Sequence, residues 1–435
     1  MSKENQFTLP PPYNQSERHP VFPDVSHDEA ARFNFLTSLN KYVSSVTQPG
    51  IRVAFERRVR PLFTAQKGRD FTTQDELKSA MLPEPCFQLW GALYRTTIEM
   101  RQQTSRSLVL KQLDKLASNT SQYTNQRPDT LHLDPTVAIP TYLTVTDNHA
   151  MPGGYYTEYR PDDVSSAATY DLGHIVKHAD AEGPLSDGMG RAVVAWLKQN
   201  YPDFAPTRIL DLGCGPGNNT LPLAIGYPAA QVTGIDVSAP MLRYSHARSV
   251  ALNVPNVDFA QINAEKLPYD DESVDWVQTT SFLHETSKAA LEQIIREIHR
   301  VLKPGGTLLL TTVNRLFSLT RNPWHVREYT ADELKKLMLR YFPKVDTQGI
   351  HGNGKVMTYY EQNKKSVEKI TRYDVLNLQH RLPRWMLQVP YDLLNRLNRN
   401  KLLEQDGLAA EIQYTDYVLT NTPAGSLDFF YLARK

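Results

Sequence analysis

The 435-residue sequence predicts an α/β fold in its second half, an open and largely parallel sheet with helices on both faces. Two observations support this prediction. An apolar strand pattern runs directly into a glycine-rich turn and a helix over Arg208–Asn219, which reads RILDLGCGPGNN. From there to Val313, strand patterns alternate with helical patterns, which is the order that builds parallel sheets. Ligands of such sheets bind at the carboxyl ends of the strands, where this turn lies.

The composition argues against several classes of protein. Hydrophobic residues make up 40% of the chain and charged residues 22%, as in ordinary globular proteins. A formal net charge of +1 gives no general attraction to nucleic acid or membranes. No apolar run approaches the roughly 18 residues of a spanning helix, and the first residues lack the apolar core of a signal peptide. The two cysteines, Cys86 and Cys214, are far apart and predict neither disulfides nor a metal site, so we expect a cytoplasmic protein.

The first third of the chain predicts a tail and a helical domain. Residues 1–27 contain five prolines, which predicts an extended or disordered tail. Residues 28–165 are expected to form a mostly helical domain, because apolar residues recur at helical spacing. Its end differs: residues 136–146 are rich in β-forming residues, and the loop that follows contains a Pro-Gly-Gly turn. We expect this loop to act as a lid with His149, Tyr155 and Tyr156 as candidate substrate contacts, although a linker with aromatic packing explains them equally well.

A pair of histidines follows the lid loop. His174 and His178 lie one helical turn apart, a spacing that can bind a metal. No third ligand lies near them in the sequence, so we predict no metal site. We expect the segment to fold over the edge of a cofactor instead.

The glycine-rich turn predicts a particular kind of ligand. Gly213, Gly215 and Gly217 allow positive φ angles and let a ligand approach the backbone. The spacing G-x-G-x-G differs from the dinucleotide fingerprint, whose third glycine would fall at Asn218. The carboxylate of Asp211 would repel a pyrophosphate but attract a cationic group. The turn therefore favours a cationic, phosphate-free adenosine ligand over NAD; a glycine turn without a ligand is the alternative.

The strands after the turn end in polar residues suited to such a ligand. The second strand, 231–236, ends at Asp236, where a carboxylate can accept hydrogen bonds from ribose hydroxyls. The third strand, 257–262, is followed by Asn263, and the fourth, 273–280, by a segment that contains His284. A helix over 288–302 and a Lys-Pro-Gly-Gly turn lead into a fifth strand.

These motifs, in this order and spacing, resemble those of the class I S-adenosylmethionine-dependent methyltransferases over residues 205–315, about a quarter of the chain. They look most like the type-11 small-molecule subgroup, which includes the quinone-biosynthesis methyltransferases. The resemblance implies a Rossmann-like seven-stranded methyltransferase sheet with helices on both faces, whose last strand, 426–432, is antiparallel beside the fifth. It implies a methyltransferase domain over 166–435 with a helical insertion at 353–415. The family commonly has aspartate at Asn263, where an amide oxygen can still accept a hydrogen bond. The S-adenosyl-L-methionine contacts that the family implies are Asp211, Gly213, Gly215, Gly217, Asp236, Val237, Asn263, Ala264 and Thr280.

The chemistry follows from this cofactor. The sulfonium methyl group is already reactive, so the protein mainly aligns the acceptor and excludes water. A hydroxyl or protonated amine must also lose a proton, and His284 is the predicted general base. Glu285 either orients His284 or faces solvent, and a histidine that only shapes the next helix is the alternative. The segment 321–330 brings His325 and Arg327 to the expected substrate pocket, or serves as a surface connector.

We therefore expect methyl transfer to a small-molecule acceptor, most commonly to oxygen or nitrogen. A methyltransferase-like binding or regulatory protein without activity is the alternative. No Asp/Asn-Pro-Pro-Tyr tetrapeptide and no basic excess is present, which argues against a nucleic-acid substrate. Residues 363–401 hold nine Lys and Arg against three acids. This basic amphipathic stretch is either a helical cap or a peripheral membrane contact.

Overall fold

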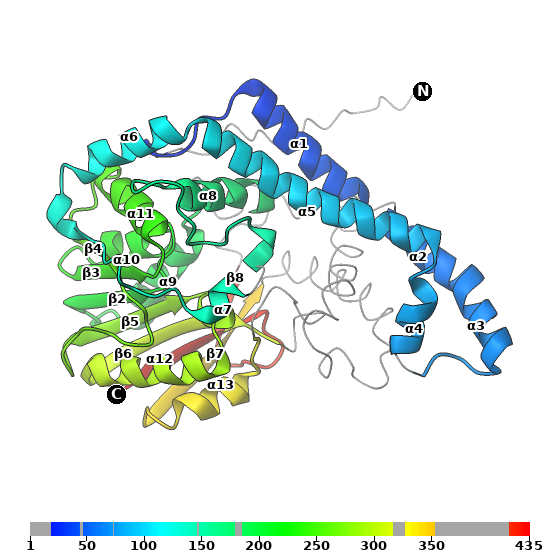
Figure 1. Ribbon diagram of the computed structural model, residues 1–435. Helices are drawn as coiled ribbons and strands as arrows, with labels where there is room; N and C mark the ends of the chain where they lie inside the picture. Colours follow the sequence, from blue (N-terminus) through cyan, green and yellow to red (C-terminus); the bar gives the residue numbers. More distant parts are fainter. Residues whose placement is uncertain are drawn as a thin grey trace, which may run out of the picture.

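The computed structural model describes residues 19–43, 47–72, 74–145, 148–178, 185–315, 327–352 and 417–435. Its centre is one sheet with the strand order β1-β4-β3-β2-β5-β6-β9-β7-β8 (Figure 1). The strands are β1 (Leu131–His132), β2 (Arg208–Leu212), β3 (Gln231–Asp236), β4 (Val257–Gln261), β5 (Val274–Thr280), β6 (Leu302–Val313), β7 (Lys344–Gly352), β8 (Tyr417–Thr420) and β9 (Asp428–Arg434).

The strand pairing places the carboxyl ends of the central strands at one edge. Strands β1 to β6 pair in parallel, while β9 is antiparallel and lies between β6 and β7. The predicted parallel order and the antiparallel last strand are therefore both observed. The described sheet has nine strands where seven were predicted, because β1 and β8 extend its two edges. These edge strands have two and four residues, too few to produce an alternating sequence pattern.

Helices cover both faces of the sheet, and the strands are apolar on both faces for that reason. Leu308 and Leu310 of β6 pack on one side with α12 and α13, whereas Leu309 packs on the other with α9, α10 and α11. This alternation is the period of two that a strand imposes. The helices are α9 (Gly188–Asn200), α10 (Thr220–Gly226), α11 (Ala239–Ala251), α12 (Lys288–Val301) and α13 (Ala331–Met338).

A layer of N-terminal helices packs on the α/β part. Helices α5 and α6 share a buried core with α8 and α11, in which Leu108, Leu116, Leu172 and Tyr244 take part. The helices of this layer are α1 (His27–Tyr42), α5 (Pro85–Lys111), α6 (Leu113–Thr124) and α8 (Ser165–His178). Part of the predicted N-terminal tail belongs to it, because Val21 is fully buried in the same core. The division into domains at residue 165 stays a prediction.

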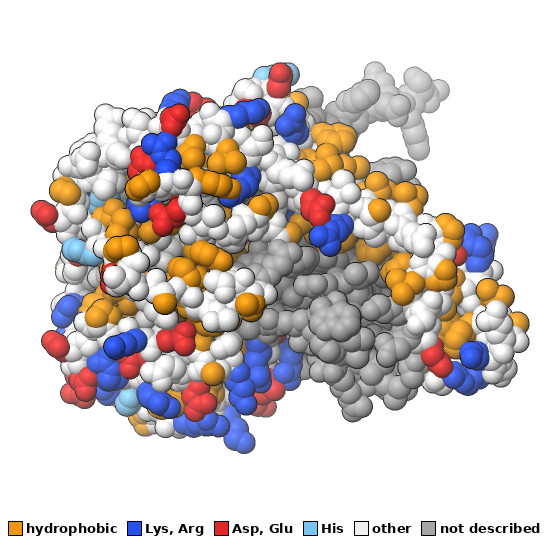
Figure 2. All heavy atoms as spheres, in the orientation of Figure 1, with side chains coloured by type: hydrophobic (Ala, Val, Ile, Leu, Met, Phe, Trp, Pro, Cys, Tyr) orange, Lys and Arg blue, Asp and Glu red, His pale blue; other side chains and the backbone are white. Residues whose placement is uncertain are grey.

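The far part of this layer forms a helical arm (Figure 1). Here Trp90 and Tyr94 of α5 pack with the short helices α2 (Gln48–Ala54), η2 (Phe55–Val59) and α4 (Gln74–Met81). Helix α3 (Arg60–Lys67) joins them through Phe63, which stacks on Phe71. Hydrophobic side chains gather along the arm on the face that Figure 2 shows, and the arm's exposed ones include Leu62 and Leu89. Among the helices that the structure describes, none is long and apolar enough to cross a membrane.

The segment between the helical layer and the sheet differs from its prediction. Residues 136–146 were expected to be β-rich, but Thr141–Thr144 form the short helix α7. Pro140 precedes this helix and cannot donate a hydrogen bond to a strand. Three single-turn helices lie nearby or in the α/β part: η3 (Pro128–Thr130), η4 (Asn148–Ala150) and η5 (Leu283–Glu285).

Candidate cofactor and active site

The glycine turn after β2 has the backbone that only glycine adopts readily. Gly213, Gly215 and Gly217 have φ angles of 69°, 50° and 80°. A Cβ on Gly213 would lie 2.5 Å from Cδ2 of Phe282, so this glycine is needed for packing. A Cβ on Gly215 would meet no atom within 4 Å, so Gly215 faces open space at the carboxyl end of the sheet.

Asp236 ties the glycine turn to the end of β3. Its Oδ2 accepts a hydrogen bond from the Gly215 amide at 3.0 Å, and its Oδ1 accepts one from the Ser238 amide at 2.9 Å. Burial raises the pKa of this carboxyl, while these amide bonds lower it. The neighbouring Val237 carbonyl accepts from Gln261 Nε2 at 3.1 Å. A carboxylate oxygen can accept more than one hydrogen bond, so the corner made by Gly215 and Asp236 fits a ribose.

Asp211 is more buried than its place in the motif suggested. Its Oδ2 accepts from the Thr220 hydroxyl at 2.6 Å, which joins β2 to the first residue of α10. Burial raises the pKa of Asp211 to about 7. The hydrogen bond from Thr220 lowers this pKa, and the charge of Asp236 raises it further. Two further predicted contacts, Ala264 and Thr280, are also buried.

Asn218 has a structural role that the motif did not suggest. Its Oδ1 accepts from Arg248 Nη1 at 3.0 Å, and its Nδ2 donates to the Ser186 carbonyl at 2.8 Å. The same Nη1 donates to the Pro216 carbonyl at 3.2 Å and lies 3.8 Å from Asp171 Oδ1. A third glycine could not make these contacts, so this position fastens the glycine turn to α11 and to the segment before α9.

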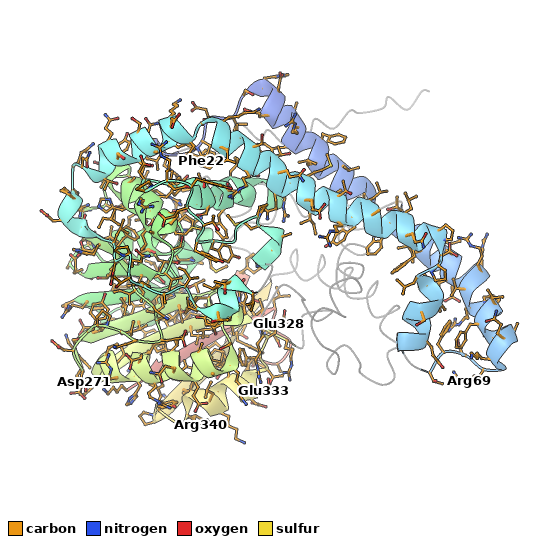
Figure 3. The ribbon with its side chains drawn as sticks, viewed as in Figure 1. Phe22, Arg69, Asp271, Glu328, Glu333 and Arg340 are labelled. Carbon is orange, nitrogen blue, oxygen red and sulfur yellow. The ribbon has the colours of Figure 1, made fainter. Side chains whose placement is uncertain are left out.

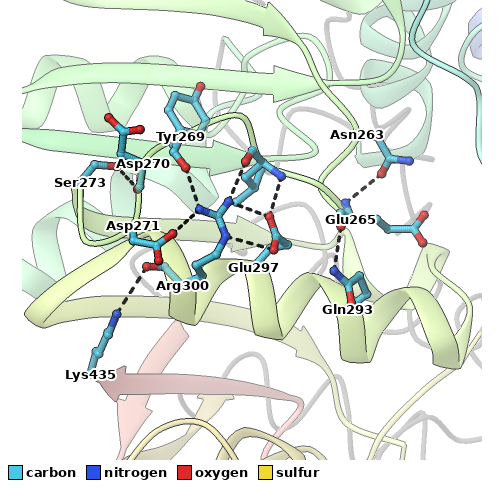
Figure 4. A network of polar contacts seen from close by, with 11 residues as sticks. Asn263, Glu265, Tyr269, Asp270, Asp271, Ser273, Gln293, Glu297, Arg300 and Lys435 are labelled. Atoms are coloured by element: carbon cyan, nitrogen blue, oxygen red, sulfur yellow. Dashed lines mark hydrogen bonds and ion pairs between the residues drawn. The ribbon is translucent and has the colours of Figure 1, made fainter.

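The loop after β4 is held against α12 (Figure 4). Asn263 Oδ1 accepts from the Glu265 amide at 2.9 Å, and the Glu265 carbonyl accepts from Gln293 Nε2 at 3.2 Å. Arg300 donates to the Leu267 carbonyl at 2.7 Å. The Asn263 amide oxygen thus orders its own turn, and its second lone pair is the one a ligand would use.

The short helix α7 adds a residue that the sequence did not reveal. The Tyr142 phenol lies close to the carboxyl group of Glu265. Burial raises the pKa of Tyr142, and the charges of Glu265 and Asp236 raise it further. Tyr142 therefore lies beside the cofactor corner. Tyr156, a predicted substrate contact, is half-buried beside Gly154.

Tyr155, a predicted substrate contact, joins its loop to the end of β3. Its carbonyl accepts from the Ser238 hydroxyl at 2.8 Å, and its ring packs edge-on against Tyr170 with centroids 5.8 Å apart. Burial raises the pKa of the Tyr155 phenol, and Glu285, Tyr170 and Asp236 raise it further. The phenol thus lies within the influence of carboxylates from the ends of both β3 and β5.

Glu285 stands between two histidines. Its Oε1 lies 3.0 Å from His149 Nε2 and 3.5 Å from His284 Nε2. Burial would raise the pKa of Glu285, but the hydrogen bonds from His149 and His284 outweigh burial and hold it below its ordinary range. Glu285 therefore orients histidines and does not face solvent. Asp428 of β9 lies near His284. Burial raises the pKa of Asp428 to about 6, although the charge of His284 lowers it.

The segment after β6 reaches the same cluster. The Arg327 amide donates to the His284 carbonyl at 3.1 Å, while the Arg327 guanidinium lies 5.1 Å from the centre of the Tyr329 ring. The neighbouring Glu328 is buried, at the end of the sheet that faces the helical arm (Figure 3). His325 and residues 363–401 lie outside the described residues.

Most of the described candidate residues lie at one end of the sheet. The structure adds Tyr142, Asp428 and Arg248 to the residues that the sequence suggested. No group of three or more metal-ligating side chains that could hold an ion occurs within the ranges that the structure describes.

Known proteins match the part of the chain that carries this site. Residues 209–306 match a family model described as a methyltransferase domain. An uncharacterised methyltransferase of Synechocystis is 40% identical over 108 residues, 25% of this chain and 48% of the relative. A malonyl-[acyl-carrier protein] O-methyltransferase of Legionella pneumophila is 34% identical over 113 residues, 26% of this chain and 38% of the relative. A trans-aconitate 2-methyltransferase of Paracidovorax citrulli is 36% identical over 119 residues, 26% of this chain and 42% of the relative. The chain thus spans less than half the length of these relatives.

Proposed function

We propose that this chain, whose residues 209–306 form a class I S-adenosylmethionine-dependent methyltransferase domain, transfers the methyl group of S-adenosylmethionine to a small-molecule acceptor. The observation that carries the proposal is the corner of Gly215 and Asp236. Gly215 faces open space with a positive φ, and its amide is tied to the Asp236 carboxylate. A backbone that can be approached closely beside a ribose-binding carboxylate is what an adenosine cofactor requires.

Oxygen or nitrogen is the acceptor atom that the neighbouring side chains favour. A hydroxyl or a protonated amine must lose a proton during methyl transfer. His284 and His149 both contact Glu285 just beyond the end of β5, so imidazoles that can take a proton lie near the cofactor corner. The name of the Legionella relative, an O-methyltransferase, agrees with an oxygen acceptor.

The test compares two glycines with the same backbone strain. Gly215 and Gly68 have φ angles of 50° and 67°, and a Cβ added to either residue would meet no atom within 4 Å. Gly215→Ala and Gly68→Ala should therefore each destabilise the fold by about 1–2 kcal/mol. We expect Gly215→Ala alone to weaken S-adenosylmethionine binding at least tenfold by calorimetry, because Gly68 ends α3 in the helical arm.

Three outcomes separate the possible functions. Equal binding by both glycine variants, or no binding of S-adenosylmethionine to the intact chain, would overturn the cofactor site. Binding together with transfer of the labelled methyl group to a low-molecular-weight cell fraction supports the enzyme. Binding without transfer to any fraction would favour a methyltransferase-like binding or regulatory protein.

A further inference from the structure

We propose, building on the function proposed above, that His149 is the general base of methyl transfer and that Glu285 and Gln102 position it. His149 lies in η4, outside the segment that matches the methyltransferase family model. Nothing in the motif-bearing part of the chain points to this residue. Three features of its surroundings carry the assignment.

The first feature is the carboxylate behind the ring. Glu285 Oε1 lies 3.0 Å from His149 Nε2 and accepts a hydrogen bond from it. A neutral imidazole that donates from Nε2 carries its lone pair on Nδ1. Glu285 therefore selects the tautomer with Nδ1 as the basic atom and stabilises the imidazolium that forms when Nδ1 takes a proton.

The second feature is access. The side chain of His149 is 32% exposed, against 8% for that of His284. His284 is enclosed between Glu285 and Asp428, and its carbonyl accepts from the Arg327 amide. Of these two histidines on one carboxylate, only His149 is open enough to meet an acceptor molecule. His284 then helps to orient Glu285.

The third feature is the backbone that holds the ring in place. His149 and Ala150 both have a φ of 53°, in the left-handed region that residues other than glycine seldom adopt. Strain of this kind persists only where the surroundings enforce it. Gln102 Nε2, from the middle of α5, donates to the His149 carbonyl at 2.9 Å. The helical layer thus fixes the position of a residue in the site.

Tyr155 links Glu285, the partner of His149, to the corner of Gly215 and Asp236. The Tyr155 phenol is influenced by both Glu285 and Asp236, and the Tyr155 carbonyl is bonded to Ser238 directly after β3. Among the described residues, the charged or titratable groups of this cluster include Glu285, His284 and Tyr155, and Asp428 lies near His284. We place the acceptor beside Tyr155, between the Gly215–Asp236 corner and the pair of Glu285 and His149.

The step balances without a further reactant. For a hydroxyl acceptor, the acceptor oxygen forms a bond to the methyl carbon while the carbon–sulfur bond breaks and its electron pair stays on sulfur. The O–H bond breaks, and its proton goes to Nδ1 of His149. The resulting imidazolium is paired with the Glu285 carboxylate until it releases the proton to water.

The experiment measures methyl transfer from labelled S-adenosylmethionine to the low-molecular-weight fraction of a cell extract, with calorimetry of S-adenosylmethionine binding beside it. We expect His149→Gln to lower transfer about 100-fold or more while binding changes less than twofold. Its pH–rate profile should lose the acid limb of the intact enzyme. His284→Gln should lower transfer less than tenfold. His27→Gln removes an exposed histidine that also pairs with a carboxylate, Asp28, and should change nothing.

The roles of Gln102 and Glu285 are tested by separate measurements of kcat, KM and the pH profile. Gln102→Ala should lower kcat about tenfold without changing S-adenosylmethionine binding or KM, whereas Gln103→Ala, an exposed neighbour on α5, should behave as the intact chain. Glu285→Gln keeps a polar partner for His149 but removes the charge, so we expect a fall in kcat with an altered pH profile.

The outcomes are distinguishable. Transfer by His149→Gln within threefold of the intact chain, or a larger loss in His284→Gln, would overturn the assignment while leaving the cofactor site standing. An intact chain that does not bind S-adenosylmethionine would overturn the proposed function, and the assignment of His149 would fall with it.

Discussion

Asp211 shows at the residue scale how burial changes the meaning of a charged side chain. In the sequence it is a carboxylate at the end of a strand, suited to attract a cation. In the structure it is 2% exposed and bonded to Thr220, and burial raises its pKa to about 7. An unfolded aspartate ionises near pH 3.9. The free energy of unfolding should therefore decrease as the pH rises from about 4 to 7, because the folded protein then holds an ionised, buried carboxylate.

Asp211→Asn removes this dependence on pH. The amide can still accept the Thr220 hydrogen bond, so the variant should match the intact protein near pH 4 and be more stable above pH 7 by up to a few kcal/mol. Denaturant unfolding of both proteins between pH 4 and 8 measures the difference. Asp203→Asn replaces an exposed aspartate and should leave the pH dependence as it is. A parallel pH dependence in the intact protein and Asp211→Asn would contradict the prediction.

The sequence predicts some residues of the candidate site and not others. Gly215 and Asp236 belong to a local strand–turn pattern, and the structure shows them in contact. Tyr142 and Asp428 follow no pattern, because their approach to the site depends on how distant segments pack. In the sequence, Asn218 only marks the absence of a third glycine. Its partner, the buried guanidinium of Arg248, lies 30 residues further along the chain, so the motif does not reveal this contact.

At the scale of elements, the loop between β4 and β5 shows how a helix holds a connection. Arg300 of α12 donates to the carbonyls of Leu267 and Tyr269 at 2.7 and 2.8 Å and pairs with Glu297 and Asp271 (Figure 4). The start of this loop carries Asn263, one of the predicted contacts of S-adenosylmethionine. The order of this loop therefore depends on Arg300, a single side chain of α12.

Arg300→Ala should loosen this loop. Two carbonyls lose their charged donor, so we expect the unfolding free energy to fall by about 1–3 kcal/mol and amide exchange to increase over residues 263–273. S-adenosylmethionine affinity should fall several-fold. Arg340→Ala removes a surface arginine that pairs with the Glu292 side chain at 3.1 Å, and should leave exchange in the loop unchanged (Figure 3). Equal exchange rates in the two variants would show that Arg300 does not order the loop.

The elements were predicted unequally well for a physical reason. Strands β2 to β6 are buried on both faces, so their apolar runs and the turns between them are visible in the sequence. Edge strand β1 has two residues and owes its pairing to β4, a partner far along the chain. Helix α7 lies in a segment that was predicted to be β-rich, and Pro140, directly before it, cannot donate a hydrogen bond to a strand. Such elements form because of tertiary contacts, which cannot be inferred from the local sequence.

At the scale of the molecule, a buried polar network joins the N-terminal segment to the glycine turn. His19 Nε2 lies 2.8 Å from Asp171 Oδ2, and the Tyr244 hydroxyl donates to the same oxygen at 2.9 Å. Arg248, near Asp171, holds the Pro216 carbonyl. Burial lowers the pKa of His19 despite the hydrogen bond to Asp171. The N-terminal segment, α8 and α11 are distant in sequence and thus share one polar network with the glycine turn.

His19→Ala should weaken S-adenosylmethionine binding from a distance. Asp171 loses one partner, so Arg248 is positioned less firmly, and we expect the dissociation constant to rise several-fold and the unfolding free energy to fall by about 1–3 kcal/mol. Limited proteolysis should cut the segment around residue 19 faster. His27→Ala, which removes a fully exposed histidine, should match the intact chain in all three measurements. Unchanged cofactor affinity in His19→Ala would show that the network supports the fold without acting on the turn.

The position of β9 has a consequence for the order in which the molecule is made. This strand lies between β6 and β7, yet residues 314–427 separate it from β6 along the chain. During synthesis, β6 emerges long before the strand that covers its edge, and it presents unpaired N–H and C=O groups for the whole interval. Synthesis proceeds at roughly 5–20 residues per second, so this edge is open for several seconds. The nascent chain is most exposed to aggregation and chaperone binding in that interval, which ends only when β9 leaves the ribosome.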